Sequence, residues 1–401
     1  MRIAQINTVY AVGSTGNLAR SLVQVAREQG HEAFCFYGRP HPRAAALPGE
    51  AEYFGNRLDC YAHILRTRLL DQHGKGSRTI TRRLIRKLRN YDPDIIHLHN
   101  VHGYYLNLEI LTDYLKQSAT PVIWTMHDCW LYTGHCAYYT AKQCRKWQAG
   151  CSDCPAGRDY PASWFRDASR QNYHWKRDCL SGLPNVTFVP PSQWLANETS
   201  ESFLRHYPVR VIHNGIDTEL FWRSDEHKPA AEPGAKPQLI AVANYWEPRK
   251  NLEAILYVAE QLRDSVSIVV VGKLLSSPED WPDNVRHIAQ TANPGELATL
   301  YAQSDLLLNP TLEDNFPTVN IEAVAGGTPV ITYSTGGSPE AMFGFGEVLK
   351  ENSPECLVKT VTKWLNNAFV RPPRPARSLL AKETMVQSYL QLYEEIYVKG
   401  R

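Results

Sequence analysis

The sequence contains no apolar run long enough to cross a bilayer as a helix, which takes about 20 residues. It also lacks an excess of one charge, because 43 Lys and Arg residues nearly balance 41 Asp and Glu residues, for a net charge of +2. A nucleic-acid ligand is therefore disfavoured, since proteins that bind one carry a basic patch. The start, MRIAQINTVY, has a strand pattern rather than that of a secretory signal. We expect a cytoplasmic enzyme; peripheral attachment to the inner face of the plasma membrane is a further hypothesis.

A complete G-x-G-x-x-G motif is also absent from the β-α-β unit that the N-terminus predicts. A strand at 2–8 is followed by Gly13 and Gly16, a helix through Gln29 and a second strand at 32–37. Glycines at the carboxyl end of a strand lie where open α/β sheets bind their ligands. As a dinucleotide motif this loop is weak, and a simple turn explains it equally well.

Nine cysteines are present, and in a reducing compartment disulfides are not the default. Four of them fall in one short stretch, where four thiolates could close a tetrahedral structural zinc site. Only one C-x-x-C pair is present where a zinc ribbon would have two, so free buried thiols and adventitious disulfides stay open as alternatives. The candidate zinc ligands are Cys136, Cys144, Cys151 and Cys154.

The stretch 309–340 places carboxylates inside an apolar frame. We expect a buried strand at 305–308, a helix with Pro317 in its first turn, and a further strand at 329–332. The free N–H groups at such a helix start form an anion site that suits a phosphate. Carboxylates rarely lie in such a frame without a partner; those present are Asp314, Glu322 and Glu340.

Two further groups of polar residues follow predicted strands. Arg249 and Lys250 come after a strand at 239–244, at a turn into a helix, where fixed cations suit a diphosphate. His127 comes directly after a strand at 121–126. A solvated basic turn and a structural histidine are the simpler interpretations of these residues.

The strand at 94–100 carries His97 and His99 on one face. We interpret both as structural histidines with satisfied ring nitrogens. A metal site formed with His102 is an alternative, although strand neighbours two residues apart rarely close a tetrahedral site alone.

Residues 78–89 predict a basic amphipathic helix, with an apolar stripe at helical spacing and six Lys or Arg residues. Such a helix can lie on an anionic membrane surface. The alternative is an ordinary covering helix that packs its apolar stripe on the sheet.

Several of these motifs together resemble retaining GT-B glycosyltransferases of family 4, in particular a colanic-acid and exopolysaccharide biosynthesis subgroup. The resemblance rests on GSTG at 13–16, HLHN at 97–100, the T-M-H-D-x-W-x-x-T-G-H-C stretch at 125–136, NGID at 214–217 and D-x7-E at 314–322. PRKN at 248–251 completes the set. The resemblance covers nearly the whole chain.

The resemblance implies an α/β GT-B fold, in which two Rossmann-like domains face a central cleft and the last helix crosses back to the first domain. We expect an acceptor-side domain at 1–213, with 382–401 packing back on it. A nucleotide-sugar-binding domain is expected at 214–381.

The resemblance also assigns roles to single residues. Glu322 would hold the donor ribose, Asp314 would face the transferred sugar, and His127 would contact that sugar near its 6-hydroxyl. The predicted catalytic residues are His127, Asp314 and Lys250. The predicted donor-binding residues are Gly13, Gly16, Arg249, Lys250, Asn315, Phe316, Pro317, Thr318, Val319 and Glu322.

Two positions depart from the family pattern. Asp314 stands where the first acid of the signature is Glu, which shortens its reach by one methylene. Asn244 stands where many members carry Arg, so one phosphate contact is in doubt and Arg249 could replace it.

The activity implied is transfer of a sugar from a nucleotide-diphosphate sugar to a hydroxyl of a glycan or lipid-linked oligosaccharide, with retention and without a catalytic cofactor. A catalytically silent GT-B scaffold subunit and a nucleotide-sugar epimerase of the same fold are the alternatives. The predicted partners are the donor, the acceptor and a membrane surface met through 78–89, with no nucleic acid.

Overall fold

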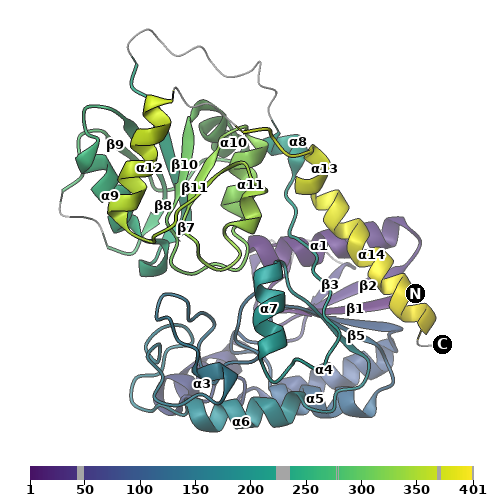
Figure 1. The fold of residues 1–401 in the computed structure, drawn as a ribbon. Helices are drawn as coiled ribbons and strands as arrows, with labels where there is room; N and C mark the ends of the chain where they lie inside the picture. The colour runs from purple at the N-terminus through teal and green to yellow at the C-terminus, as the bar shows by residue number, and fades with distance from the viewer. Residues whose placement is uncertain (43–48, 223–234, 277, 279, 368–371, 400–401) are drawn as a thin grey trace. The chain divides into compact units, whose positions relative to one another are not determined.

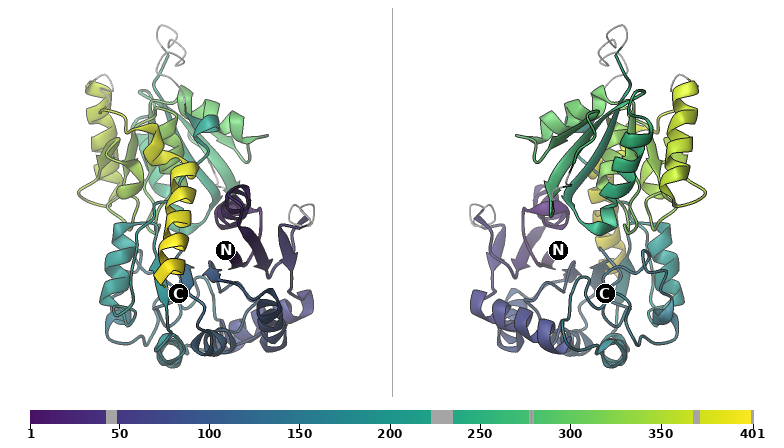
Figure 2. Two further views of the ribbon diagram at one scale, coloured as in Figure 1. Left: turned by 90° about the vertical axis from the view of Figure 1, so that its right-hand side faces the viewer. Right: turned by 90° about the vertical axis from the view of Figure 1, so that its left-hand side faces the viewer.

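A computed structural model describes residues 1–42, 49–222, 235–276, 278, 280–367 and 372–399. Contacts divide the chain into two compact units. Unit 1 comprises Met1–Ile212 and Val386–Arg401, and unit 2 comprises His213–Met385. Each unit contains a six-stranded sheet in which every pair of neighbouring strands is parallel. Helices lie on both faces of each sheet (Figures 1 and 2).

The sheet of unit 1 has the strand order β3-β2-β1-β4-β5-β6. Its strands are short, and the central ones are almost fully buried, as expected for a parallel sheet covered on both faces, whereas the edge strand β3 is half-buried. They are β1 (Arg2–Asn7), β2 (Glu32–Tyr37), β3 (Ala51–Tyr53), β4 (Ile95–Leu98), β5 (Val122–Thr125) and β6 (Val186–Val189). The helices are α1 (Gly13–Glu28), α3 (Arg57–Leu70), α4 (Arg78–Tyr91), α5 (Leu108–Gln117), η1 (Lys146–Gln148), α6 (Ser169–Leu180) and α7 (Gln193–Glu201).

The last helix, α14 (Lys382–Lys399), packs on the sheet of unit 1 (Figure 1). Tyr389 and Tyr393 are buried there. The hydroxyl of Tyr393 lies 2.6 Å from Nδ1 of His97, and that of Tyr389 lies 2.9 Å from Oγ1 of Thr125. These bonds join the end of the chain to the carboxyl ends of β4 and β5.

Helix α4 buries the apolar stripe that the sequence predicted. Ile80, Leu84, Ile85 and Leu88 belong to the core of unit 1, whereas Arg82, Arg83, Arg86 and Arg89 are exposed. The stripe is the covering face of the helix, as the alternative interpretation held, and it cannot enter a bilayer while α4 stays packed on the sheet. In the part of the chain described, no helix is both long and apolar enough to cross a membrane.

The sheet of unit 2 has the order β12-β11-β10-β7-β8-β9. Its strands are β7 (Gln238–Trp246), β8 (Ser267–Leu274), β9 (Val285–Ile288), β10 (Leu306–Asn309), β11 (Val330–Thr332) and β12 (Gly346–Val348). The helices are α8 (Thr218–Phe221), η3 (Pro248–Lys250), α9 (Leu252–Gln261), α10 (Pro294–Gln303), α11 (Thr318–Ala325), η4 (Glu340–Met342), α12 (Pro354–Asn366) and α13 (Arg377–Leu380). Separate apolar clusters on the two sides of this sheet form the core of the unit.

Candidate functional site

A cavity of about 320 Å³ opens in unit 2 at the carboxyl ends of three neighbouring strands. Ligands bind at this edge of open α/β sheets. Gly272 in β8 has φ of +133°, and a Cβ there would lie 2.0 Å from the carbonyl oxygen of Ala243. Only glycine therefore lets β7 and β8 run so close beneath the cavity. The lining residues are Val242, Ala243, Asn244, Val271, Gly272, Lys273, Ala289, Gln290, Thr291, Leu297, Thr318, Val319 and Glu322.

Glu322 is the only carboxylate among these lining residues. Its Oε2 accepts a 3.0 Å hydrogen bond from the hydroxyl of Tyr301, which is fully buried. Burial raises the pKa of Glu322 to about 7, although the hydrogen bonds from Tyr301 and Thr318 oppose the rise. Near neutral pH the acid and carboxylate forms of Glu322 are therefore both populated. Hydroxyl groups of a ligand would donate to the carboxylate and favour that form.

Buried polar side chains fix the start of α11, the helix that carries Glu322. Asn309 donates to Oδ1 of Asn320 at 2.7 Å, and Asn320 donates to the carbonyl oxygen of Ser338 at 3.0 Å. Ser338 in turn bonds Thr332 at 2.6 Å. Pro317 is the N-cap residue, so the helix starts one residue later than predicted. Thr318 and Val319, the first residues of the helix, line the cavity, and the free N–H groups of a helix start favour an anion.

Lys250 and Asp314 form a close ion pair beside this helix. Nζ of Lys250 lies 2.6 Å from Oδ2 of Asp314, and the two side chains are only 16% and 17% exposed. Asp314 also accepts from the backbone N–H of Phe316 at 3.2 Å. A Cβ on Gly336 would lie 1.9 Å from the carbonyl oxygen of Asp314, so a glycine closes the loop against this residue. The pair does not line the cavity.

Arg249 joins the turn η3 to the loop that contains Asp314. Its Nε donates to Glu247 at 2.7 Å and its Nη1 donates to the carbonyl oxygen of Glu313 at 3.3 Å. The backbone N–H of Leu312 donates to the carbonyl oxygen of Arg249 at 2.8 Å. The structure therefore brings Arg249, Lys250 and Asp314 together.

Asn315 and Phe316 are buried and do not line the cavity. The Phe316 ring stacks on His213, with ring centroids 5.0 Å apart and an interplanar angle of 18°. Nε2 of His213 lies 3.8 Å from the carboxylate of Glu340. Of the predicted donor-binding residues in unit 2, Thr318, Val319 and Glu322 line the cavity.

In unit 1, His127 follows β5, and its Nε2 lies 3.4 Å from Nδ1 of His99. Burial lowers the pKa of His127 to about 4, which the nearby Asp128 only partly offsets. Both ring nitrogens of His97 have partners, Tyr393 and Thr125, and Nε2 of His99 bonds Gln5 at 3.1 Å. The structural interpretation of His97 and His99 is confirmed.

Gly13 and Gly16 form the first turn of α1 instead of the loop that we expected before it. The helix begins at Gly13, where φ is +64°. Ala11 donates its N–H to the carbonyl oxygen of Gly16 at 3.0 Å, and a Cβ on Gly16 would lie 3.2 Å from the nitrogen of Ala11. Gly13 is exposed and Gly16 is buried.

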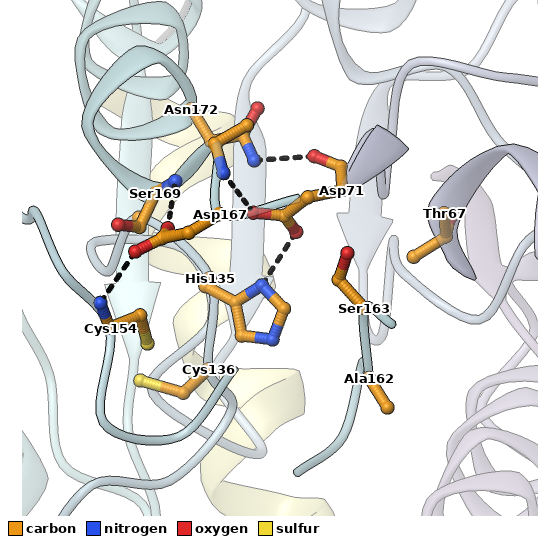
Figure 3. A network of polar contacts seen from close by, with 12 residues as sticks. Thr67, Asp71, His135, Cys136, Cys154, Ala162, Ser163, Asp167, Ser169 and Asn172 are labelled. Carbon is orange, nitrogen blue, oxygen red and sulfur yellow. Dashed lines mark hydrogen bonds and ion pairs between the residues drawn. The ribbon is translucent and has the colours of Figure 1, made fainter. Parts of the chain in front are cut away.

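The four candidate zinc ligands all lie in unit 1. Among the described residues, no group of three or more His, Cys, Asp or Glu side chains could hold a metal ion. This finding also covers His97, His99 and His102. The sulfur atoms of Cys136 and Cys154 face each other (Figure 3), and their hydrogen bond lowers the pKa of Cys154 to about 7. Cys144 and Cys151 are partly exposed free thiols. Whether the purified protein carries zinc stays a prediction.

Sequence reasoning missed a buried polar group next to His127. Oδ2 of Asp128 lies 2.6 Å from Nε2 of His102, whose Nδ1 bonds the hydroxyl of Tyr160 at 3.1 Å. Oδ1 of Asp128 accepts from the N–H of Trp130 at 2.9 Å, which fixes the turn that carries His127. Lys176 is buried over the Trp130 ring at 3.7 Å, and burial lowers its pKa to about 7. No spacing in the sequence connects residues so far apart.

Two protein-family models match the chain. Residues 15–220 match the family described as Glycosyltransferase Family 4, and residues 223–378 match Glycosyl transferases group 1. The putative colanic acid biosynthesis glycosyl transferase WcaC of Escherichia coli K12 is 26% identical over 99% of this chain and 100% of its own length. A D-inositol 3-phosphate glycosyltransferase of Mycobacteroides abscessus is 28% identical over 33% of each chain.

Two solved structures are similar over almost the whole chain. Sucrose-phosphate synthase of Thermosynechococcus elongatus has a TM-score of 0.65 at 16% identity and covers 99% of both chains. Anabaena Alr3699/HepE in complex with UDP has a TM-score of 0.66 at 14% identity and covers 98% of this chain and 100% of its own. At such identities the likeness concerns the fold, and it confirms the two-domain architecture that the sequence predicted.

Proposed function

The chain belongs to glycosyltransferase family 4 and has the GT-B fold, and we propose that it transfers a sugar from a nucleotide-diphosphate sugar to a hydroxyl, with retention at the anomeric carbon. The observation that carries the proposal is the cavity of unit 2, where Glu322 and the first turn of α11 share one wall. A carboxylate suits a ribose diol, and helix N–H groups suit the phosphates attached to that ribose.

Lys250 and Arg249 supply the cations for the leaving diphosphate. As the bond to the sugar breaks, negative charge grows on the diphosphate, and cations fixed beforehand stabilise that charge without reorganisation. Asp314 holds Nζ of Lys250 at 2.6 Å, and Glu247 holds Nε of Arg249 at 2.7 Å. A diphosphate oxygen can then take the proton of the acceptor hydroxyl, so that no protein base is required for that step. By the family resemblance, we assign Asp314 and His127 to contacts with the transferred sugar.

Relatives guide the choice of substrates to test. Alr3699/HepE was solved with UDP and with UDP-glucose, which supports a nucleotide-diphosphate donor. The likeness to WcaC, a putative colanic acid biosynthesis glycosyl transferase, supports a role in exopolysaccharide synthesis. We propose a glycan or lipid-linked oligosaccharide as the acceptor. A silent scaffold subunit is the first rival function, since Asp314 and Asn244 depart from the family pattern. A nucleotide-sugar epimerase of the same fold is the second.

A screen of nucleotide sugars by thermal shift identifies the donor, because a ligand bound only to the folded state raises the melting temperature by mass action. The donor found is then supplied with glycan acceptors, and the anomeric configuration of the product is determined by NMR. Turnover with retention that Glu322→Ala removes supports the proposal. Interconversion of nucleotide sugars without an acceptor would indicate the epimerase, and donor binding without turnover would indicate the scaffold.

A further inference from the structure

Helix α3 of unit 1 presents its apolar face outward. Leu58, Tyr61 and Leu65 are 79%, 68% and 55% exposed, and Leu69 is 37% exposed. These positions repeat at three- and four-residue intervals, so they form one stripe along the helix. The inward face instead buries His63 and Thr67. An ordinary covering helix, such as α4, has the opposite arrangement.

Polar bonds hold α3 in this orientation. Nδ1 of His63 lies 3.0 Å from the hydroxyl of Ser77, and its Nε2 accepts from the N–H groups of Gly74 and Gly76 at 3.1 and 3.3 Å. Burial lowers the pKa of His63 to about 4, so the ring is neutral and Nε2 can act as this acceptor. Turning the leucines inward would break these buried bonds, which is costly in an apolar interior.

A neighbouring loop extends the apolar stripe. Trp164 and Phe165 are 58% and 79% exposed. The N–H of Trp164 donates to the carbonyl oxygen of Arg68 at 2.7 Å, and the guanidinium of Arg68 lies 5.6 Å from the centroid of the Trp164 ring. The α3–Trp164 surface, as we name it, comprises Leu58, Tyr61, Leu65, Leu69, Trp164 and Phe165.

Hydrogen bonds hold the base of the α3–Trp164 surface, and those of Asp71 are buried (Figure 3). Asp71 is the C-cap residue of α3, and its Oδ1 lies 2.6 Å from Nδ1 of His135. Its Oδ2 accepts a hydrogen bond of 2.8 Å from the N–H of Ala168. Asp167 accepts from the N–H groups of Cys154 and Ser169 at 2.7 and 2.8 Å. The helix end and the loop are thus tied together, and little ordering is needed when the surface docks.

The charges around this surface are mainly positive. Arg57 and Arg68 follow one side of the stripe and Arg66 the other, and Arg158 and Arg166 lie in the loop. Asp59, Asp71, Asp159 and Asp167 carry the opposite charge, but Asp71 faces His135 and Asp167 accepts from backbone N–H groups, so the five arginines outnumber the acidic side chains.

We propose that the α3–Trp164 surface docks on an anionic lipid bilayer, with its leucine and aromatic side chains in the headgroup region and its arginines on the lipid phosphates. Leu, Trp, Tyr and Phe bordered by Arg are the composition of interfacial segments. A second copy of the chain fits less well, because a two-fold interface would bring the same arginine border against itself. The exposed cations of α4 can add electrostatic attraction but no apolar contact.

The test is co-sedimentation of the full-length protein with vesicles of phosphatidylcholine alone or mixed with phosphatidylglycerol, at low and high salt. The two test variants are Trp164→Ser with Phe165→Ser, and Leu58→Gln with Leu65→Gln. The matched control is Leu275→Ser with Val398→Ser, since those side chains are 63% and 72% exposed elsewhere on the chain. Neither donor nor acceptor is added, so the result does not depend on the proposed transfer activity.

We expect the native protein and the control to bind the anionic vesicles in a salt-dependent manner. Each test variant should bind these vesicles at least about tenfold more weakly. The substituted side chains are exposed, and the helical circular dichroism of each variant is compared with that of the native protein; two separate pairs keep the test decisive if one misfolds. No binding by the native protein, or equal loss in the control, would overturn the proposal. So would a dimer, detected by light scattering, that the test variants dissociate.

Discussion

The two units have the same parallel architecture and opposite electrostatic character at the carboxyl edges of their sheets. In unit 1 the edge carries His97, His99 and His127, and burial lowers the pKa of each below its ordinary value. These rings are neutral at pH 7 and act only through hydrogen bonds. The three rings therefore supply hydrogen bonds and no charge of their own.

In unit 2 the edge keeps its charges. Lys250 and Asp314 are paired but still partly exposed, and Glu322 lines an open cavity with a raised pKa. Arg249 and Lys250 stand beside this edge, and fixed cations can stabilise the charge of a diphosphate. Under the proposed function, unit 2 supplies that charge stabilisation, whereas the histidines of unit 1 act through hydrogen bonds.

The largest effect is expected from Lys250→Ala, which removes the cation that unit 1 cannot replace. Turnover should fall by about 10²–10³-fold, the scale measured when one preorganised donor to a developing anion is removed. Steady-state kinetics with the donor identified by thermal shift measures the loss, and Lys350→Ala, at an exposed position, is the control. Full turnover in Lys250→Ala would contradict the division between the units.

The next largest effect concerns Glu322→Gln. If the carboxylate binds the ribose hydroxyls, donor affinity should fall by about 1–3 kcal/mol, the scale of a hydrogen bond to a charged group. Titration calorimetry measures the change. Glu253→Gln, at an exposed position on α9, is the control and should leave affinity as it is. An unchanged affinity in Glu322→Gln would mean that the ribose binds elsewhere.

A pH dependence should distinguish the two edges further. The pKa of Glu322 is about 7 in the free protein, and hydroxyl donors favour its carboxylate form. Donor affinity should therefore rise by about tenfold between pH 6 and pH 8, as the competent fraction increases. Glu322→Gln should abolish this rise, whereas the neutral histidines of unit 1 contribute nothing in that range. An equal rise in Glu322→Gln would assign the titration to another group.

The same ionisation affects stability. Because the folded pKa of Glu322 is raised above the unfolded value, the folded state binds more protons between pH 4.5 and about 7, and its stability falls as pH rises through that window. Glu322→Gln should accordingly raise the melting temperature at pH 8 and leave it nearly unchanged at pH 4. The comparison is read from thermal unfolding curves in the absence of ligand.

Much of the architecture could be predicted from the sequence, because apolar strands alternating with helical segments determine a parallel sheet. The position of Arg249 and Lys250 in a turn after a strand followed from the sequence, whereas their contact with the loop of Asp314 did not. The hydrogen bond from Tyr301 to Glu322 could not be predicted, because it depends on how α10 packs against α11.

Helix α3 shows most clearly what the sequence could not predict. Its leucine stripe has the spacing of an inward face, whereas the bonds of His63 to the loop at 74–77 and those of Asp71 hold that face outward.

The smallest effect is expected from His127→Gln, which tests the neutral edge of unit 1. Glutamine keeps a hydrogen-bonding group but misplaces it, so turnover should fall about fivefold, equal to about 1 kcal/mol for one neutral hydrogen bond. Affinity for the free nucleotide should not change. A donor whose sugar lacks the 6-hydroxyl is the matched control, because with it the native protein and the variant should react alike. If the variant loses as much with that donor as with the complete one, His127 acts through the packing of its turn rather than through the sugar.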